Sequence, residues 1–266
     1  MILPDSPSIK AVFFDIDGTL VSFKTGKIPS STLRALSELK KKNIKIIVAT
    51  GRSVDAIQHI TSLNFDGFIT FNGGCCVSKK GDILFREAIN KNDITSLVQY
   101  ADEHPLNYSL MYFDKVMLND TTPEVIGMYA HLNLPVPPIV RKNDIDIDNV
   151  LQANIFLGPE EENEFMKNIM PNCIASRWTP LFADVNPKGI TKKLGVDCFC
   201  QYFGIDISET MSFGDGGNDI SMIKHTKIGV AMGKANNNVK EIADYITDDV
   251  DDDGIENALI HFKVIS

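Results

Sequence analysis

The sequence predicts an α/β fold in which a doubly wound, Rossmann-like parallel sheet carries an inserted α+β unit. At both ends of the chain, short apolar segments alternate with amphipathic helical segments, an order typical of a parallel sheet with helices on both faces. In the middle of the chain, neighbouring strands are expected to pair with each other instead. We therefore expect residues 1–83 and 185–266 to form the sheet unit and residues 84–184 to form the inserted unit.

The amino-terminal segment is expected to supply three strands and two helices. Residues 9–14, 44–49 and 67–71 are short apolar runs, which indicates buried strands. Residues 29–42 carry leucines at helical spacing and end in three lysines that match the helix dipole. A second helix is expected over residues 53–63, with a serine as its N-cap.

The inserted unit and the carboxyl-terminal segment are expected to differ in how helices and strands alternate. In the inserted unit we expect helices at 91–104, 123–131 and 160–169 and strands at 107–112, 115–119, 151–157, 173–177 and 181–185. In the carboxyl-terminal segment we expect helices at 190–203, 218–224, 236–243 and 253–263 and strands at 210–214 and 227–231.

The composition is that of a globular protein with an acidic surface. Of 266 residues, 44% are hydrophobic, and 26 basic against 35 acidic residues give a formal net charge of −9, a balance that disfavours binding to nucleic acid or to an anionic membrane. Five cysteines are too few for a disulfide scaffold. No apolar run approaches the roughly 20 residues that cross a membrane, so we expect a cytoplasmic protein. The sequence indicates no oligomeric state.

Two aspartates follow the first expected strand. Asp15 and Asp17 alternate on an extended chain and can face one pocket until Gly18 turns the chain away. Two neighbouring carboxylates repel each other unless a cation or a shared proton intervenes. The pair therefore indicates a Mg²⁺ site or a division of labour between a nucleophile and an acid–base group.

Three later segments carry groups suited to phosphate or magnesium. Thr50-Gly51-Arg52 ends the second strand, and Gly214 to Asp219 follows a later one and includes Asn218. The carboxylate oxygens of the segment Gly214 to Asp219 are suitable ligands for a hard cation. Lys188 and Lys192 lie where a helix opens after the insertion. We interpret these strand and helix ends as parts of one site, because ligands bind at the carboxyl ends of parallel strands.

Together these motifs resemble those of the haloacid dehalogenase (HAD) superfamily. The segments are Asp15-x-Asp17-Gly-Thr-Leu, Thr50-Gly51-Arg52, a lysine at a later helix start, and Gly-Asp215-x-x-Asn218-Asp219. Their order and the long insertion are similar to Cof-type phosphatases with the larger α/β (type IIB) cap. The resemblance implies a magnesium-dependent phosphatase of small phosphorylated metabolites, with hexose or pentose phosphates as the first candidates, acting through a phosphoaspartate.

The resemblance also implies roles for individual residues. Asp15 is the expected nucleophile, Asp17 the acid–base group and Lys192 the phosphate-binding lysine, chosen over Lys188 because Gly-Ile-Thr-Lys matches the family's run. The expected magnesium ligands are Asp15, Asp17 through its backbone carbonyl, Asp215 and Asp219, with Asp219 alternatively supporting the lysine. The phosphate is expected to contact Ile16, Thr50, Gly51, Lys192 and Asn218. Arg52 and Asn72 are expected to bind substrate at the boundary with the cap. Arg177 is also expected at this boundary, and Arg177 and Trp178 are further candidates for substrate contact.

Two other functions remain open at this level. A phosphomutase of phosphomannomutase type would also form a phosphoaspartate and would differ only in what attacks it. A receiver-like signalling protein would carry a phosphorylated aspartate without turnover, but such proteins need neither Asp17 nor an inserted unit of about 100 residues.

Overall fold

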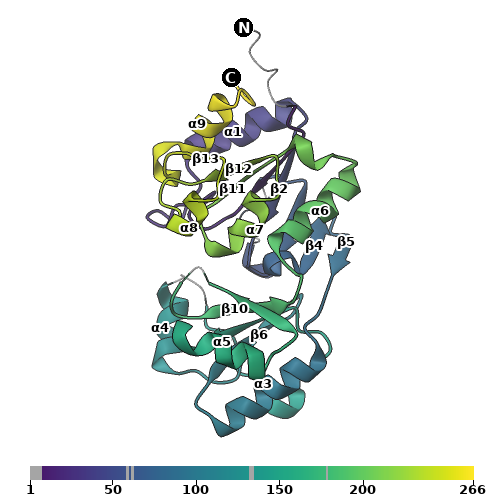
Figure 1. Cartoon of the computed structure of the whole chain (residues 1–266), viewed down its shortest axis with the longest axis vertical. Helices are drawn as coiled ribbons and strands as arrows, with labels where there is room; N and C mark the ends of the chain where they lie inside the picture. The colour runs from purple at the N-terminus through teal and green to yellow at the C-terminus, as the bar shows by residue number, and fades with distance from the viewer. Residues whose placement is uncertain (1–7, 58–59, 61–62, 132–134, 178) are drawn as a thin grey trace.

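The chain folds into two sheets that lie one above the other along the long axis of the molecule (Figure 1). The structure, a computed structural model, describes residues 8–57, 60, 63–131, 135–177 and 179–266. Within them, an eight-stranded sheet has the order β13-β12-β11-β1-β2-β3-β4-β5, and a five-stranded sheet has the order β7-β6-β8-β10-β9. The mixed α/β fold with an inserted cap unit is therefore confirmed.

The first sheet is parallel from β13 to β3. Its central strands are almost fully buried, because their runs are apolar on both faces. The parallel strands are β1 (Ala11–Phe14), β2 (Lys45–Ala49), β3 (Gly67–Thr70), β11 (Thr210–Gly214), β12 (Ile228–Ala231) and β13 (Tyr245–Ile246).

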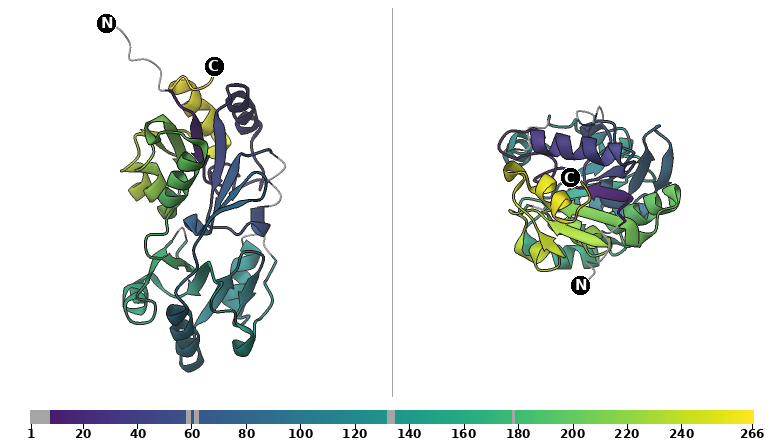
Figure 2. Two further views of the ribbon diagram at one scale, coloured as in Figure 1. Left: turned by 90° about the vertical axis from the view of Figure 1, so that its right-hand side faces the viewer. Right: turned by 90° about the horizontal axis from the view of Figure 1, so that it is seen from above.

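Helices cover both faces of this sheet, as the doubly wound prediction requires (Figure 2). Alternate residues of β1 divide between the two layers: Val12 and Phe14 pack with α1 (Ser30–Lys41) and α9 (Gly254–His261), whereas Ala11 and Phe13 pack with α6 (Lys192–Phe203) and α7 (Ile220–Ile223). The short helix α8 (Asn237–Lys240) packs beside β12.

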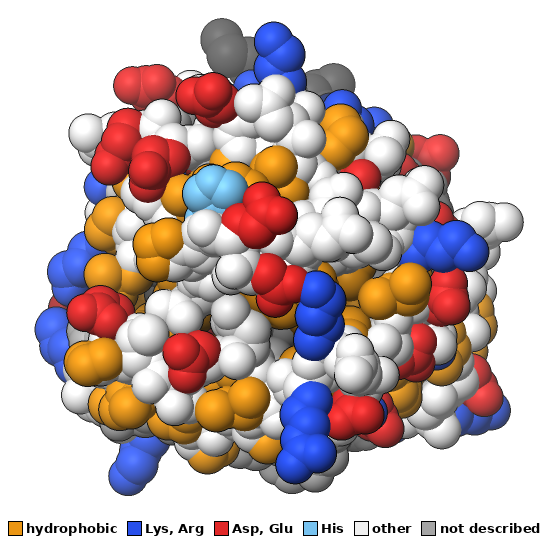
Figure 3. Space-filling view, turned by 90° about the horizontal axis from the view of Figure 1, so that it is seen from below, with side chains coloured by type: hydrophobic (Ala, Val, Ile, Leu, Met, Phe, Trp, Pro, Cys, Tyr) orange, Lys and Arg blue, Asp and Glu red, His pale blue; other side chains and the backbone are white. Residues whose placement is uncertain are grey.

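The second sheet is antiparallel and has two different faces. Its strands are β6 (Asn107–Met111), β7 (Val116–Leu118), β8 (Gln152–Phe156), β9 (Cys173–Ser176) and β10 (Ala183–Pro187). One face packs on α3 (Lys91–Glu103) and α5 (Pro159–Asn168). Helix α4 (Pro123–His131) packs on Leu118 and Phe182 in a separate cluster. On the free end of this unit, acidic, basic and hydrophobic side chains are interspersed (Figure 3).

The structure differs from the sequence prediction at three places in the strands. A hairpin, β4 (Cys75–Ser78) and β5 (Ile83–Arg86), extends the first sheet in antiparallel fashion and was not expected. The two-residue strand β13 replaces part of an expected loop. The expected domain boundaries at 83/84 and 184/185 fall inside β5 and β10, so we propose that the chain passes between the units after Arg86 and after Pro187.

Three expected helices also differ. The helix expected at 53–63 lies partly outside the described residues, and its described part includes a 3-10 turn at Asp55–Ile57. The expected helices 218–224 and 236–243 are shorter, with only one α-helical turn each at α7 and α8. No helix among the described residues is both long and apolar enough to cross a membrane.

Candidate active site

The site lies where three neighbouring parallel strands end. Strands β11, β1 and β2 are adjacent in the sheet, and the residues that follow them are Asp215, Asp15 and Thr50. Their carboxyl ends meet at one edge because the strands are parallel. These three residues line a cavity of about 810 Å³ between the first sheet and the cap.

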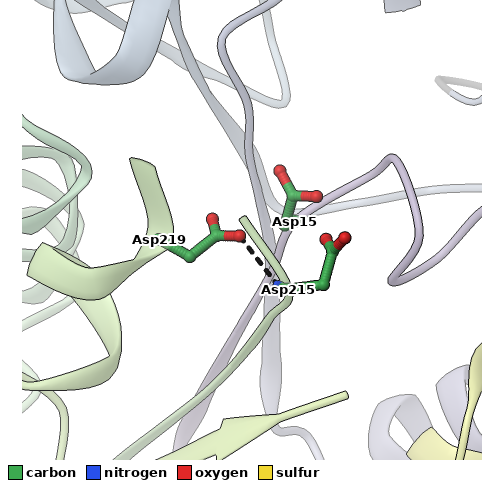
Figure 4. A group of neighbouring side chains, drawn as sticks. All are labelled: Asp15, Asp215 and Asp219. Atoms are coloured by element: carbon green, nitrogen blue, oxygen red, sulfur yellow. Dashed lines mark hydrogen bonds between the residues drawn. The ribbon is translucent and has the colours of Figure 1, made fainter. Parts of the chain in front are cut away.

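Asp15 and Asp215, which line this cavity, form a compact acidic cluster with the buried Asp219 (Figure 4). One carboxylate oxygen from each of Asp15, Asp215 and Asp219 lies within 4.8 Å of the others. Thr19 donates a hydrogen bond of 3.3 Å to Asp215 and so orients it. A set of carboxylate oxygens at this spacing suits a hard divalent cation such as Mg²⁺.

Electrostatics also favours a cation here. Burial, together with the negative charges of Asp219 and Asp17, raises the pKa of Asp15 to about 7, although Lys192 acts against this. Burial and the charges of Asp15 and Asp219 raise the pKa of Asp215 to about 9. The carboxylates therefore repel each other in a buried site, and a divalent cation would offset that repulsion.

Lys192 is fully buried beside this cluster. Its Nζ lies 2.6 Å from Oδ1 of Asp15 and 2.6 Å from Oδ1 of Asp219. Burial acts to lower the pKa of Lys192, but the charges and hydrogen bonds of the two aspartates outweigh it and leave the pKa above its usual value. Lys188 is exposed. The structure thus places Lys192, and not Lys188, at the expected nucleophile.

Asp219 is held by the protein on both of its oxygens. Oδ1 accepts from Lys192, and Oδ2 accepts from the backbone N–H groups of Asp215 and Gly216 at 3.0 and 2.9 Å. The contact between Asp219 and the Asp215 backbone is the dashed line in Figure 4. Asp219 therefore fixes the lysine and the loop that carries Asp215, which favours the supporting role among those expected for it.

The expected acid–base residue, Asp17, lines the cavity and is paired with Arg52. The Arg52 guanidinium donates two hydrogen bonds, Nε to Oδ2 at 2.8 Å and Nη2 to Oδ1 at 2.6 Å. Such a two-pronged contact fixes the plane of a carboxylate. Gly18, which directly follows Asp17, has φ +79°, and a Cβ there would lie 2.6 Å from Oδ2 of Asp215. Only glycine fits this close approach.

The expected phosphate-binding groups gather around Thr50. Its Oγ1 accepts a hydrogen bond of 3.1 Å from the Arg52 backbone N–H, which leaves the hydroxyl hydrogen available as a donor. Gly51 and Asn218 also line the cavity. Ile16 is fully buried just below, and its carbonyl accepts from Val21 at 2.7 Å.

The cap closes the cavity with residues that the sequence reasoning did not single out. Apolar side chains on the cap form one wall, which includes Met111, Val116, Met128, Pro137 and Phe182. Three polar side chains, Gln152, Asn154 and Asp184, also line the cavity, and Gln152 donates to the Gly51 carbonyl at 3.1 Å. Alternation of polar and apolar residues along β8 and β10 was the available signal, but such alternation normally marks a solvent-facing side of a strand.

Asn72 and Arg177 lie at the boundary with the cap, as expected, but neither side chain lines the cavity. Asn72 is buried beneath the cavity wall rather than lining it. The Arg177 side chain points into the cap, where it pairs with Glu162 and donates 2.7 Å to the Leu157 carbonyl. Trp178 lies outside the described residues.

Residues 12–259 match the family model of haloacid dehalogenase-like hydrolases. A solved structure of BT1666 from Bacteroides thetaiotaomicron, described among phosphatases of the HAD superfamily, has a TM-score of 0.92 and 37% identity and covers 100% of this chain and 99% of that one. The structure of BT4131, a HAD subclass IIB sugar phosphatase, has a TM-score of 0.90 and 41% identity over 96% of this chain and 100% of that one. The 5-amino-6-(5-phospho-D-ribitylamino)uracil phosphatase YcsE of Bacillus subtilis (strain 168) is 28% identical over 96% of each chain.

The fold and the acidic site define a protein with a Rossmann-like sheet unit and an aspartate cluster beneath a cap. The chain belongs to the haloacid dehalogenase-like hydrolase family, and it is similar to that family's subclass IIB phosphatases. The predicted family and enzyme class are therefore confirmed.

Proposed function

We propose that the protein is a Mg²⁺-dependent phosphatase that hydrolyses small phosphate esters, sugar phosphates first among them, through a phosphoaspartate on Asp15. The observation that carries this proposal is the contact of a buried lysine with the carboxylate that ends β1. Lys192 lies 2.6 Å from Asp15 inside a cluster of aspartates. A carboxylate in such a place can attack phosphorus only if cations offset the charge of the phosphate dianion.

The two expected aspartates suit different tasks. Asp15 is held by Lys192 and faces the cavity, so it supplies the attacking oxygen, and the bond from phosphorus to the alcohol oxygen breaks as the new bond forms. Asp17 is held by Arg52 and lines the same cavity, so it can donate a proton to the leaving alcohol and later accept one from water. A bound Mg²⁺ would neutralise charge on the transferring group.

The cap supports a small, enclosed substrate. Its apolar wall faces the aspartates across a cavity of about 810 Å³, a size that accommodates a small metabolite. A wall of this kind excludes water from the reacting groups while the carbon face of a sugar packs against it. The sugar phosphatase BT4131, at 41% identity, supports sugar phosphates as the first class to test.

The test is a screen of hexose, pentose and ribityl phosphates with Mg²⁺, measured as phosphate release by the wild type and by Asp15→Asn. We expect turnover of at least one sugar phosphate by the wild type and none by the variant. Asp114→Asn, an exposed aspartate in the cap, is the matched control and should retain full activity. Rapid acid quenching should trap one phosphoryl group on the peptide that contains Asp15.

Three results would contradict the proposal. Phosphate release that survives in Asp15→Asn would exclude the phosphoaspartate. Conversion of one sugar phosphate into its isomer without phosphate release would indicate a mutase. A stable phosphoprotein that releases no phosphate would indicate a receiver-like role.

A further inference from the structure

The face of the cap sheet that looks toward the first sheet carries polar side chains that are buried. On β10, Ala183 and Val185 pack on the cap helices, so the alternate residue Asp184 points the other way. On β8 the same alternation turns Gln152 and Asn154 toward the first sheet. All three are less than 10% exposed. Buried polar groups need hydrogen-bond partners, and these find them in one another and in the phosphate-binding loops.

Asp184 is the only carboxylate among these side chains. Its Oδ2 accepts from Nδ2 of Asn72 at 3.0 Å, and its Oδ1 accepts from Nδ2 of Asn154 at 2.6 Å. Burial raises its pKa to about 6, against the hydrogen bonds from the two amides and the charge of Lys192. Above that pH the group is ionised and can only accept hydrogen bonds. Both amides must therefore present their NH₂ groups to it.

The orientation of Asn72 in turn sets the orientation of the Asn218 amide. Because Asn72 turns Nδ2 toward Asp184, its Oδ1 faces the first sheet, where it accepts 3.0 Å from Nδ2 of Asn218. Asn218 in turn must donate to Asn72 with one hydrogen of its NH₂ group. The second hydrogen of that group is then available to an acceptor in the cavity, which Asn218 lines. If the chain of amides ran the other way, Asn218 would offer an oxygen to Asn72's NH₂ group.

A second branch reaches the loop after β2. Asn72 also donates 3.1 Å to Oε1 of Gln152, so the Nε2 of Gln152 is the end that meets the Gly51 carbonyl, at 3.1 Å. Asn72 itself is held with φ 54°, and its backbone N–H donates to the Thr50 carbonyl at 3.0 Å. Both phosphate-binding loops are thus tied to the cap through one buried asparagine.

We propose that Asp184 is a positioning residue that makes Asn218 a hydrogen-bond donor toward the substrate phosphate, acting through Asn72. The acceptor-only carboxylate orders the amides in one direction, from Asp184 to Asn72 to Asn218, and the cap thereby completes an anion site on the other unit. This inference rests on the proposed function. Loss of one preorganised donor to a developing anion typically costs about 10² to 10³ in rate, so disordering Asn218 should cost about 10-fold or more.

The test is a double-mutant cycle between Asp184→Asn and Asn218→Ala, read as kcat/KM for the best ester and as the dissociation constant of inorganic phosphate with Mg²⁺. In the wild-type background, Asp184→Asn should lower kcat/KM and raise the dissociation constant of phosphate, each about 10-fold or more. In the Asn218→Ala background, the same change should alter each by less than about 2-fold. Asp93→Asn is the matched control. Asp93 is another buried carboxylate of the cap, and it accepts hydrogen bonds from the backbone and side-chain N–H groups of Asn172. It does not line the cavity. It should change stability and leave phosphate affinity unchanged.

The outcomes separate the inference from the proposed function. A wild type that hydrolyses no phosphate ester refutes the function, while the phosphate-affinity cycle still decides the inference. Wild-type affinity in Asp184→Asn, or an equal loss in both backgrounds, refutes the inference alone. If Asp184→Asn does not fold, the exchanged pair Asn72→Asp with Asp184→Asn keeps an acceptor facing Asn218. It should bind phosphate at least about 10-fold more tightly than Asn218→Ala, and equal affinity would overturn the proposal.

Discussion

Replacing Lys192 by methionine tests the central ion pairs of the site. The change removes a fully buried ammonium group that lies 2.6 Å from both Asp15 and Asp219, and a methionine side chain fills a similar length of space. Two buried carboxylates are then left without their cation. Removing one partner of a buried pair typically costs about 3 to 5 kcal/mol, which for a chain of this size lowers the melting temperature by about 6 to 20 °C.

The same change should remove activity. The lysine no longer offsets the charge of the attacking carboxylate and the phosphate dianion, so we expect kcat to fall by about 10² to 10³. Thermal unfolding followed by circular dichroism, and phosphate release at saturating Mg²⁺, measure the two effects. Lys188→Met, four residues earlier and exposed, is the control and should leave both unchanged. Wild-type kcat in Lys192→Met, or an equal loss in Lys188→Met, would refute the assignment.

Three further changes test the surrounding groups. Arg52→Lys removes the two-pronged contact with the acid–base carboxylate and should lower kcat/KM about 10-fold. Arg34→Lys breaks a similar contact on the surface and should leave kcat/KM unchanged. Equal effects of the two changes would contradict a catalytic role for the pair of Arg52 and Asp17. Gly18→Ala should raise the Mg²⁺ concentration needed for half-maximal activity, because its Cβ meets a metal-cluster carboxylate at 2.6 Å. Gly26→Ala, also at positive φ but with open space around it, should leave that concentration unchanged, and a shift there would implicate backbone strain instead. Asp184 has a folded-state pKa raised from 3.8 to about 6, so its contribution to stability is present below pH 4 and is lost as the pH rises through 6. Relative to Asp184→Asn, the wild type should lose about 2 kcal/mol of unfolding free energy between pH 4 and 7.5, measured by urea denaturation, and a difference that does not change with pH would show that the carboxyl is not perturbed.

Much of the fold follows from local patterns. The apolar runs that became β1, β2, β3, β11 and β12 are buried on both faces, and such runs are visible in the sequence without knowledge of their neighbours. The hairpin of β4 and β5 was missed because β5 is largely exposed and short. Both β4 and β5 have only three consecutive apolar residues, fewer than the roughly four to eight that indicate a buried strand.

The candidate site divides in the same way. Asp15, Thr50 and Asp215 could be grouped from the sequence, because each directly follows a parallel strand and such strand ends share one edge of the sheet. Arg177 was expected near substrate but binds inside the cap. A long charged side chain has many partners within reach, and the sequence does not say which one lies closest.

The sequence by itself determined the class of fold, the order of the strands' motifs and the chemistry at the strand ends, since these depend on short segments and on general rules of chain connection. Only the tertiary structure decided that Lys192 is the buried lysine, that Arg52 holds Asp17, and that Asp184 reaches the phosphate-binding loops through Asn72. These contacts join residues 35 to 177 positions apart. The first two contacts form within the first unit, and the third joins the two sheets. Their geometry depends on how segments far apart in the chain pack together, and no local pattern in the chain encodes that packing.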